Sequence, residues 1–362
     1  MGTPIAPEGS DHLNIVDVDL WTLLQNTDRP VIVYGMGNGA DKIIDHLLAV
    51  GKKPYGVMAS DEFVRGQSFR EYPVKRLSDF EKETNHPIIL TAFGSQRPDV
   101  IKHIRKIAAA HTLYAPDVPV YGDTLFDKRF YKEHRSELES AFDMMADDLS
   151  RQTLENVINF KLSGNIDFLT KIFSDKDEAF RHILCLEKSE SFLDLGAYRG
   201  DTIQEFLTYT NGCYSHITAL EPDAKTFRKL KIYAGKMPNV QLFNMGIWND
   251  DTDLKFDASL GRGSSIRASG TQSLAVTKID TLYRRHPLTI LKMDVEGSEH
   301  QALLGGINTL QRDKPKINMA LYHRSEDLFD LPLLLHQINP SYRFYLRQHP
   351  HIPAWDLNLY AI

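Results

Sequence analysis

A short apolar run that stops at a glycine constrains this chain more than any other feature. Phe192 to Leu195 has the character of a buried strand, Gly196 and Gly200 open a turn after it, and residues 202–207 have the spacing of a helix. In an open α/β sheet, ligands bind at the carboxyl ends of the strands, where such a turn lies. The pattern therefore predicts a strand, a loop and a helix with a ligand site at the loop.

Apolar runs of strand length recur through the second half of the chain. Segments with helical spacing separate most of them, which is the pattern of an open α/β sheet with crossover helices. We expect seven core strands, at Ser191–Leu195, His216–Leu220, Val240–Asn244, Leu288–Met293, Lys316–Leu321, Tyr342–Leu346 and Leu357–Ala361. A further run at Ala275–Ile279 is a candidate partner for Asp253–Phe256 in an excursion from this sheet.

A smaller alternation of strands and helices occupies the start of the chain. Its strands are expected at Pro30–Tyr34, Pro54–Met58 and Pro87–Thr91. Between the two alternations, charged residues dominate and apolar residues recur at helical intervals, with a break expected at Gly164. The predicted organisation is a Rossmann-like domain over residues 1–122, a helical connector over 123–188 and a larger α/β domain over 189–362.

The overall composition limits the classes of function. The chain has 362 residues, which suits two domains, and its formal net charge of −6 argues against a nucleic-acid partner. The sequence lacks an apolar run of about 18 residues, the length of a membrane span, and its first residues lack the pattern of a signal peptide, so we expect a cytoplasmic protein. Cys185 and Cys213 are expected to be buried free thiols.

The glycine spacing and the following strand indicate the class of ligand. Gly196 and Gly200 form G-x-x-x-G rather than the G-x-G-x-x-G of a pyrophosphate-binding loop, so a dinucleotide fits poorly. The next strand ends at Glu221 and Pro222, where a carboxylate can accept hydrogen bonds from both hydroxyls of an adenosine ribose. The alternative is that Glu221 only caps the following helix.

The end of the third strand offers a place for an aromatic base. Gly246, Ile247 and Trp248 could supply the apolar slot that an adenine ring needs. The alternative for Trp248 is a core aromatic side chain at the corner between a strand and a hairpin.

Residues 290–299 form the densest polar group at a strand end. The strand is expected to deliver Lys292 and Asp294 to the same sheet edge, and Gly297 gives clearance before a helix that begins near Glu299. Acids at a helix N-terminus are also favoured by the helix dipole. That alternative explains Glu299 well but Lys292 and Asp294 poorly.

Taken together, these elements resemble the FkbM family of methyltransferases. The matching strings are LDLGAYRGDT from residue 193, LEPD from 220, LKMDVEGSEHQALLGG from 291 and LYHRSEDLFDLPLLL from 321. The resemblance extends to FYLRQH, to the final WDLNLYAI and to a lead-in segment at residues 144–167, so it covers residues 140–362. One departure is Tyr198, where many members carry Asn.

The resemblance implies a class I Rossmann-like methyltransferase that uses S-adenosylmethionine and methylates a hydroxyl group of a sugar, a glycan or another natural product. The cofactor would lie at the glycine loop and at the neighbouring strand ends. The expected cofactor-binding residues are Asp194, Gly196, Ala197, Tyr198, Gly200, Thr202, Glu221, Pro222, Gly246, Ile247 and Asp294.

Methyl transfer to a hydroxyl needs an aligned acceptor and a base that takes its proton. Asp294, His323 and Lys292 are the candidate catalytic residues because they are expected at the ligand edge of the sheet. An imidazole suits a base at neutral pH, although His323 could equally be a loop histidine or one that holds Asp327. Asp294 could instead orient the acceptor or bind the amino group of the cofactor. Asp294 and Glu296 are too few acids to require a metal ion.

Several cationic residues are expected in loops near the mouth of the crevice. Either they are solvated surface charges or they recognise an anionic acceptor such as a phosphorylated or carboxylated sugar. These residues are Arg262, Arg267, Arg324, Arg347 and His349.

The first domain carries a glycine motif of its own. Residues 35–40 match G-x-G-x-x-A between a strand and a helix, but Asp61 lies a little beyond the place of the expected acid. Gly35–Ala40 is therefore a candidate site for a nucleotide or a nucleotide sugar, or a structural turn. This motif leaves two other functions open, a nucleotide-dependent oxidoreductase and a relative that binds cofactor without turnover. A homo-oligomer is also left open.

Overall fold

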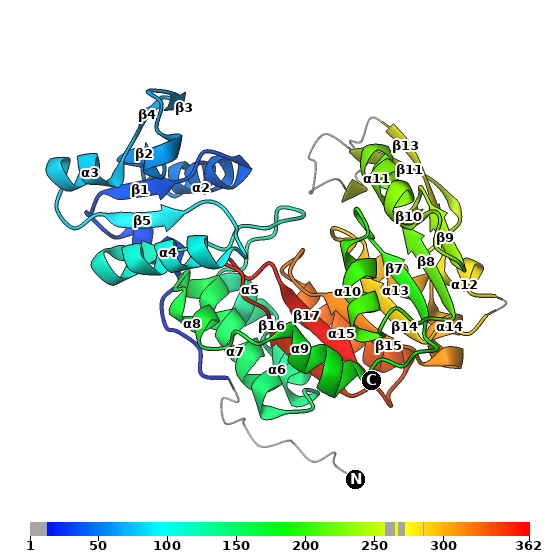
Figure 1. Ribbon diagram of the computed structural model, residues 1–362. Coiled ribbons are helices and arrows are strands. Elements are labelled where there is room, and N and C mark those ends of the chain that lie inside the picture. Colours follow the sequence, from blue (N-terminus) through cyan, green and yellow to red (C-terminus); the bar gives the residue numbers. More distant parts are fainter. Residues whose placement is uncertain (1–12, 258–264, 267–271, 285) are drawn as a thin grey trace, which may run out of the picture.

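The computed structural model describes residues 13–257, 265–266, 272–284 and 286–362. Figure 1 shows two β-sheets, one from the first third of the chain and one from its C-terminal half. Helices from the middle of the chain lie beneath the first sheet and beside the last strands of the second. Two loop cations of the sequence analysis, Arg262 and Arg267, fall outside the described residues.

The C-terminal half forms a seven-stranded sheet in the order β16–β17–β15–β14–β7–β8–β9. Its strands are β7 Ser191–Leu195, β8 His216–Leu220, β9 Val240–Phe243, β14 Ile290–Met293, β15 Lys316–Ala320, β16 Phe344–Gln348 and β17 Leu357–Ala361. Neighbours pair in parallel except at β17, which is antiparallel to both β15 and β16. This sheet confirms the predicted seven-stranded α/β fold, with β16 starting later than the expected Tyr342.

Helices cover both faces of this sheet because its buried strands alternate their side chains. In β7, Phe192 packs with Phe206 and Leu230, whereas the next residue, Leu193, belongs to the core that contains Leu303. The flanking helices are α10 Asp201–Tyr209, α11 Ala224–Ala234, α13 Glu299–Leu304, α14 Ile307–Asp313 and α15 Asp327–Ile338. The strand-to-helix loops therefore gather at the carboxyl edge of the sheet, where the site residues lie.

A small four-stranded sheet projects from this edge in the order β10–β13–β11–β12. Its strands are β10 Gly246–Ile247, β11 Thr252–Asp257, β12 Ser265–Ile266 and β13 Gln272–Thr277. Asp253 pairs antiparallel with Ala275, which confirms the expected excursion. The last of these strands ends at Thr277 because Ile279 begins the short helix α12, Ile279–Leu282.

The N-terminal sheet has the order β3–β4–β2–β1–β5–β6 and is parallel except for the pair of β3 and β4. Its strands are β1 Val31–Tyr34, β2 Gly56–Met58, β3 Ser68–Phe69, β4 Tyr72–Lys75, β5 Ile88–Thr91 and β6 Thr112–Tyr114. Its helical elements are α1 Leu20–Gln25, α2 Asn38–Ala49, η1 Asp61–Phe63, α3 Leu77–Glu83 and α4 Pro98–Ala110. Strands β3, β4 and β6 were not expected, because none of them is a continuous buried apolar run like that of β1 or β5.

The middle of the chain is helical, as its apolar spacing predicts. The helices are α5 Lys128–Glu133, α6 Arg135–Asp143, α7 Asp148–Ser163, α8 Asp167–Thr170, α9 Lys176–Glu178 and η2 Ala179–Leu184. Helix α7 ends at the expected break, where Gly164 takes a left-handed conformation with φ of 66°.

This helical segment covers the edge strand β16. The backbone N–H of Ala146 donates to the carbonyl of Phe344 at 2.8 Å, and that of Ser174 donates to Gln348 at 2.9 Å. The hydroxyl of Ser150 accepts from the N–H of Leu346 at 2.9 Å. An edge strand with free N–H and C=O groups invites pairing with other chains, so these contacts protect the sheet.

Arg347 and His349 were expected in loops at the crevice, and the structure corrects this. Arg347 lies in β16 with its side chain 2% exposed, where Asp147 and Glu178 hold the guanidinium at 2.7 and 2.8 Å. His349 is buried, and its Nε2 lies 2.8 Å from the hydroxyl of Tyr360. Both residues therefore join parts of the fold and cannot meet an acceptor.

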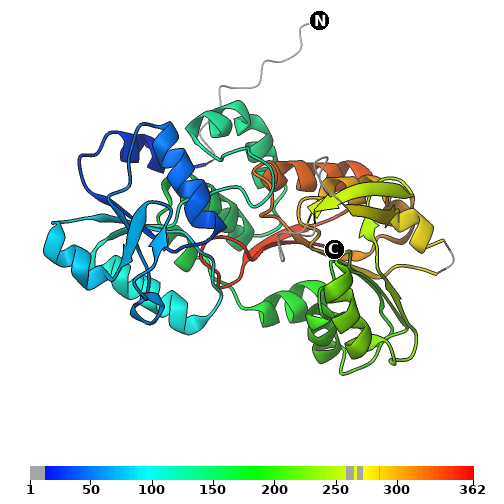
Figure 2. The ribbon, with the colours of Figure 1, turned by 90° about the horizontal axis from the view of Figure 1, so that it is seen from above.

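The two sheets meet through a loop that follows β5. Ser95 exchanges two backbone hydrogen bonds with Ile352, of 2.9 and 3.1 Å. Next to it, Gly94 lies against the ring of Trp355, so close that a Cβ would come within 2.4 Å of a ring carbon. Figure 2 shows this junction from above, with the red C-terminal segment between the two sheets.

Two further sequence expectations can be compared with the structure. Cys185 and Cys213 are exposed free thiols, not buried ones, because both lie at turns beyond helix ends. Among the described residues, none of the helices is long and apolar enough to cross a membrane.

Replacing Arg347 by Ala is expected to lower the free energy of unfolding by about 3 kcal/mol, because it leaves Asp147 and Glu178 without their buried cation. Urea denaturation of the full chain measures this loss. Arg343 lies on the approach to the same strand with an exposed side chain, and Arg343→Ala should cost less than about 0.5 kcal/mol. Equal losses for the two variants would contradict a structural role for the Arg347 network.

Candidate functional site

A cavity of about 610 Å³ opens at the carboxyl edge of the seven-stranded sheet. Gly196, Glu221, Asp294 and Tyr322 reach it from the ends of β7, β8, β14 and β15. The loop Gly94–Arg97 from the N-terminal sheet forms part of the opposite wall. The cavity therefore lies where the fold places ligands, and both sheets contribute to it.

The glycine loop after β7 depends on close packing within the protein. Gly196 has φ of +80°, and a Cβ there would lie 1.9 Å from the carbonyl oxygen of Asp294. Gly200 has φ of +94°, and its Cβ would meet the ring of Tyr233 at 2.4 Å. Tyr198 also has a positive φ, of 47°. Both glycines are thus required by neighbouring protein groups.

Glu221 is held rigidly at the end of β8. Its two carboxylate oxygens accept the backbone N–H groups of Tyr198 and Asp223, each at 2.9 Å. The side chain lines the cavity and is 7% exposed. Burial raises its pKa to about 7, although the two N–H donors act in the opposite direction. Asp223 caps helix α11 through its own side chain, so Glu221 is not needed as the cap.

An apolar slot lies beside Glu221. Met245, Ile247 and Leu274 line it, with Gly246 between the first two. Trp248, which the sequence suggested for this slot, is not among the lining residues and packs against Leu274 and Val276 of the small sheet. Leu274 enters from β13, a strand far along the chain, so the slot could not be completed from the sequence.

Two buried charges lie under the glycine loop. Asp194 is fully buried, accepts a hydrogen bond from Thr202 and lies 3.8 Å from the ammonium of Lys292. Burial raises the pKa of Asp194 to about 6, with Lys292 opposing the shift. Lys292 also donates to the carbonyl of Gly196 at 3.2 Å and lies 3.8 Å from Asp294. Lys292 therefore ties the loop to β14.

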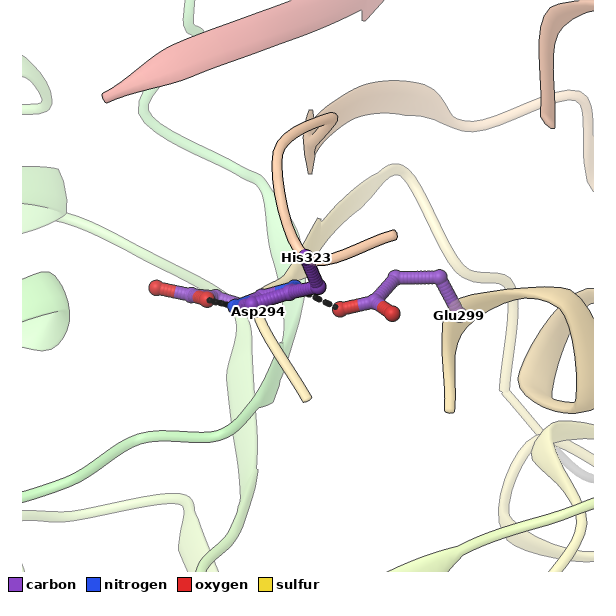
Figure 3. A group of neighbouring side chains, drawn as sticks. All are labelled: Asp294, Glu299 and His323. Atoms are coloured by element: carbon purple, nitrogen blue, oxygen red, sulfur yellow. Dashed lines mark ion pairs between the residues drawn. The ribbon is translucent and has the colours of Figure 1, made fainter. Parts of the chain in front are cut away.

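His323 is completely buried between carboxylates, as Figure 3 shows. Its Nδ1 lies 2.8 Å from Glu299, and its Nε2 lies 3.2 Å from Asp294 and 3.6 Å from Glu296. Burial alone would lower the pKa of His323, but Glu299, Asp294 and Glu296 raise it well above its ordinary value. A carboxylate faces each ring nitrogen, and this arrangement favours the doubly protonated imidazolium form of His323.

Asp294, Glu299 and His323 could also hold a metal ion by distance alone, because their ligand atoms lie within 4.8 Å of one another. A metal-bound imidazole must be neutral at the bound nitrogen. Here Glu299 faces Nδ1 and Asp294 faces Nε2, on opposite sides of the ring. This arrangement suits two N–H donors of an imidazolium better than one metal ion bound to a single nitrogen. We therefore interpret this group as ion pairs.

Asp294 is surrounded by groups that favour its ionised form. The hydroxyl of Tyr322 donates to it at 3.2 Å, and Lys292 and His323 supply two cations. Burial would raise the pKa of Asp294, but Lys292, His323 and Tyr322 outweigh burial and lower it. The carboxylate of Asp294 is therefore a fixed negative charge at the cavity wall.

The segment before α5 buries His323 from outside. The N–H of Tyr121 donates to the carbonyl of His323 at 3.0 Å, and the ring of Tyr121 lies against Gly297 and under the guanidinium of Arg324. Of the loop cations expected near the acceptor, Arg324 is thus engaged with protein groups as well.

The structure brings most of the predicted residues to the cavity. Those that line it are Gly196, Tyr198, Thr202, Glu221, Pro222, Gly246, Ile247, Lys292 and Asp294. Those that lie behind its wall are Asp194, Ala197, Gly200 and His323. Lining residues that were not predicted include Gln96, Arg97, Lys176, Met245, Leu274, Glu296, Asn318, Tyr322 and Trp355. Tyr322 and Glu296 follow expected strand ends and could have been found, whereas residues 96, 97 and 176 carry no such signal.

Acidic residues outnumber basic ones in the cavity wall. The lining acids are Asp201, Glu205, Glu221, Asp223, Asp294, Glu296 and Asp356. The lining bases are Arg97, Lys176 and Lys292, and Lys176 faces Glu205 at 3.4 Å. The cavity therefore favours cationic and uncharged ligands over anionic ones.

In the glycine motif of the N-terminal sheet, the structure shows a close contact between protein groups. A Cβ at Gly39 would lie 2.4 Å from the carbonyl oxygen of Ala92, so this glycine lets α2 approach β5. Gly37 has open space around it. At the end of β2, Ser60 is hydrogen-bonded to Tyr34 at 2.5 Å. Nucleotide binding at Gly35–Ala40 stays a prediction.

The geometry can now be compared with known proteins. Residues 194–355 match the family model of the methyltransferase FkbM domain. The matched segment begins at the buried Asp194 and ends at Trp355, so it contains the strand ends that build the cavity. No curated protein matches the chain at a significant level.

A solved structure shares the fold. A methyltransferase FkbM from Methylobacillus flagellatus KT matches with a TM-score of 0.73 and 20% identity, over 94% of this chain and 92% of that one. The two folds therefore correspond along nearly the whole length. Fibrillarin from Aeropyrum pernix, in complex with natively bound S-adenosyl-L-methionine, matches with a TM-score of 0.32 and 16% identity, over 49% of this chain and 69% of that one.

Glu221 gives the stability of the protein a specific pH dependence. Its carboxyl group has a pKa of 4.5 when unperturbed and of about 7 in the folded chain. The folded state thus keeps a proton that the unfolded state loses, so this stabilisation is complete below pH 4.5 and is lost as the pH rises toward 7. Over this pH range, the free energy of unfolding should fall by up to about 3 kcal/mol less in Glu221→Gln than in wild type.

Urea denaturation between about pH 5 and pH 7.5 measures the effect. Wild type should lose stability relative to Glu221→Gln as the pH rises. Glu62, exposed in η1, supplies the control Glu62→Gln, which should change stability by less than about 0.5 kcal/mol throughout. A constant difference between wild type and Glu221→Gln would show that burial does not shift this group.

Proposed function

We propose that this protein transfers the methyl group of S-adenosylmethionine to a hydroxyl group of an uncharged acceptor rich in hydroxyls, such as a sugar, a glycan or another natural product. The observation that carries the proposal is the acid-lined cavity with Glu221 fixed at the end of β8. The FkbM domain match over residues 194–355 supports the reaction class.

The residues on the β8 side of the cavity fit the cofactor. Each oxygen of Glu221 uses one lone pair on a backbone N–H, which leaves others for the two ribose hydroxyls. The slot of Met245, Ile247 and Leu274 suits an adenine ring. The excess of acids suits the sulfonium cation. S-adenosylmethionine, when bound, supplies an electrophilic methyl group.

The residues on the β17 side of the cavity fit an uncharged polyol. Trp355 offers an apolar ring, and Asn318, Asn358 and Gln96 offer amide groups that can both donate and accept hydrogen bonds. Arg347 and His349, two of the candidates for binding an anionic acceptor, are buried elsewhere. An anionic acceptor would meet the excess of carboxylates and bind weakly.

Within the cavity, the protein would act chiefly by positioning and electrostatics. Lys292 fixes the glycine loop to β14, and Tyr322 fixes the carboxylate of Asp294. His323 has no lone pair for an acceptor proton while both its nitrogens are protonated, so we assign it a positioning role. Such preorganised groups lower the barrier by aligning the acceptor oxygen.

Two measurements on the unmodified full-length protein test the proposal together: binding of the cofactor, and transfer of its methyl group to small acceptors. Isothermal titration should detect S-adenosylmethionine and S-adenosylhomocysteine but not NAD⁺. Transfer of a tritiated methyl group should then be assayed on neutral methyl glycosides and on glucuronic acid and glucose 1-phosphate. Neutral acceptors are expected to become labelled. Binding of NAD⁺ alone would favour the oxidoreductase reading, and cofactor binding without label in any acceptor would favour a non-catalytic relative.

Glu221→Ala is expected to weaken binding of S-adenosylmethionine by about tenfold to 100-fold, because charge-assisted hydrogen bonds of about 1.5–3 kcal/mol are lost. Isothermal titration measures this change. The exposed-site control Glu62→Gln should bind like wild type. Equal affinities of wild type and Glu221→Ala would remove Glu221 from the cofactor site.

A further inference from the structure

Glu296 occupies the turn between β14 and α13 and lines the cavity. Its side chain is 29% exposed, and its nearest cationic neighbour is Nε2 of His323, 3.6 Å from Oε2. Among the described residues, none of the hydrogen bonds engages the Glu296 carboxylate. This carboxylate is therefore available to a ligand in the cavity.

The backbone of this turn is in an unusual conformation. Glu296 has φ of 53° and Gly297 has φ of 92°, both in the left-handed region. A residue with a Cβ is disfavoured there, and such residues gather at functional sites. The ring of Tyr121 lies directly against Gly297, where a Cβ would come within 2.6 Å of it. The turn is therefore held from outside.

Most other carboxylates of the cavity are engaged by protein groups, and Asp201 differs from Glu296 in being an exposed residue of the first turn of α10. Asp294 is surrounded by Tyr322, Lys292 and His323, which hold it ionised and make it a weak base. Glu221 accepts two backbone N–H groups on the cofactor side. Lys176 lies 3.4 Å from Glu205 and 3.8 Å from Asp356.

We propose that Glu296 is the general base that takes the proton of the acceptor hydroxyl, with His323 as the positioning residue beneath it. This inference rests on the proposed methyl transfer. The acceptor oxygen forms a bond to the methyl carbon as the carbon–sulfur bond breaks, and the electron pair of that bond stays on sulfur. The hydroxyl proton goes to the carboxylate of Glu296 and from there to solvent.

The charges around Glu296 suit this role. Burial raises the pKa of Glu296 to about 7, and Asp294 and Glu299 add to the shift, whereas His323 and Lys292 oppose it. The phenol of Tyr322 lies on the same wall. A base whose pKa lies near neutral pH is ionised in a useful fraction of molecules and still binds a proton well.

The first test is the rate of label transfer to the neutral methyl glycosides, measured against pH. Wild type is expected to show a rise in rate with a midpoint near the pKa of about 7. Glu296→Gln should lower the turnover number by about 100-fold or more, lose this rise, and bind S-adenosylmethionine with unchanged affinity. Glu62→Gln is the control and should keep the wild-type rate.

Two measurements keep the test informative whatever the acceptor. In protein with ¹³C-labelled glutamate carboxyls, the resonances of Glu221 and Glu296 should both titrate near neutral pH in wild type, and one of these two titrations should be absent in Glu296→Gln. Glu296→Gly should melt at a higher temperature than wild type, because glycine suits the left-handed backbone, and should be as inactive as Glu296→Gln.

Turnover of Glu296→Gln within about threefold of wild type, or retention of the rise in rate, would overturn the assignment of the base. Loss of no neutral titration on going from wild type to Glu296→Gln would do the same. Cofactor binding by wild type without methyl transfer to any acceptor would instead overturn the proposed function.

Discussion

The arrangement of the site depends on the ion pairs of His323 with Glu299 and Asp294. An imidazolium that is 0% exposed must be compensated, and Glu299 at Nδ1 with Asp294 at Nε2 provide the compensation. These contacts join the start of α13 to the ends of β14 and β15. A neutral side chain at position 323 would leave several carboxylates facing one another in a small volume. Repulsion among them would then displace the cavity wall.

The fold and the convergence of the β7, β8 and β14 ends on one cavity could be predicted because they follow from local patterns. Strand ends are readable from apolar runs, and parallel strands bring their carboxyl ends to one edge, so Glu221 and Asp294 could be placed near Gly196. The register of β14 and β7 places Lys292 opposite Asp194, which the spacing of the two strands along the chain cannot reveal.

The remaining features depend on contacts between distant parts of the chain. Arg347 looked like a loop cation because its partners, Asp147 and Glu178, lie about half the chain away and turn it into a core residue. Leu274 lines the cavity, whereas Trp248, which the sequence suggested there, packs on the small sheet. The wall formed by Gly94–Arg97 belongs to another sheet, so a local pattern could not place it there.

The pair of backbone hydrogen bonds between Ser95 and Ile352 has a kinetic consequence. Any movement that separates the two sheets at this place must break both bonds and withdraw Gly94 from the ring of Trp355. A ligand that enters or leaves only when the two sheets separate there would have the breaking of these contacts as part of its barrier. The rate of ligand release would then depend on a contact whose residues take no part in the reaction.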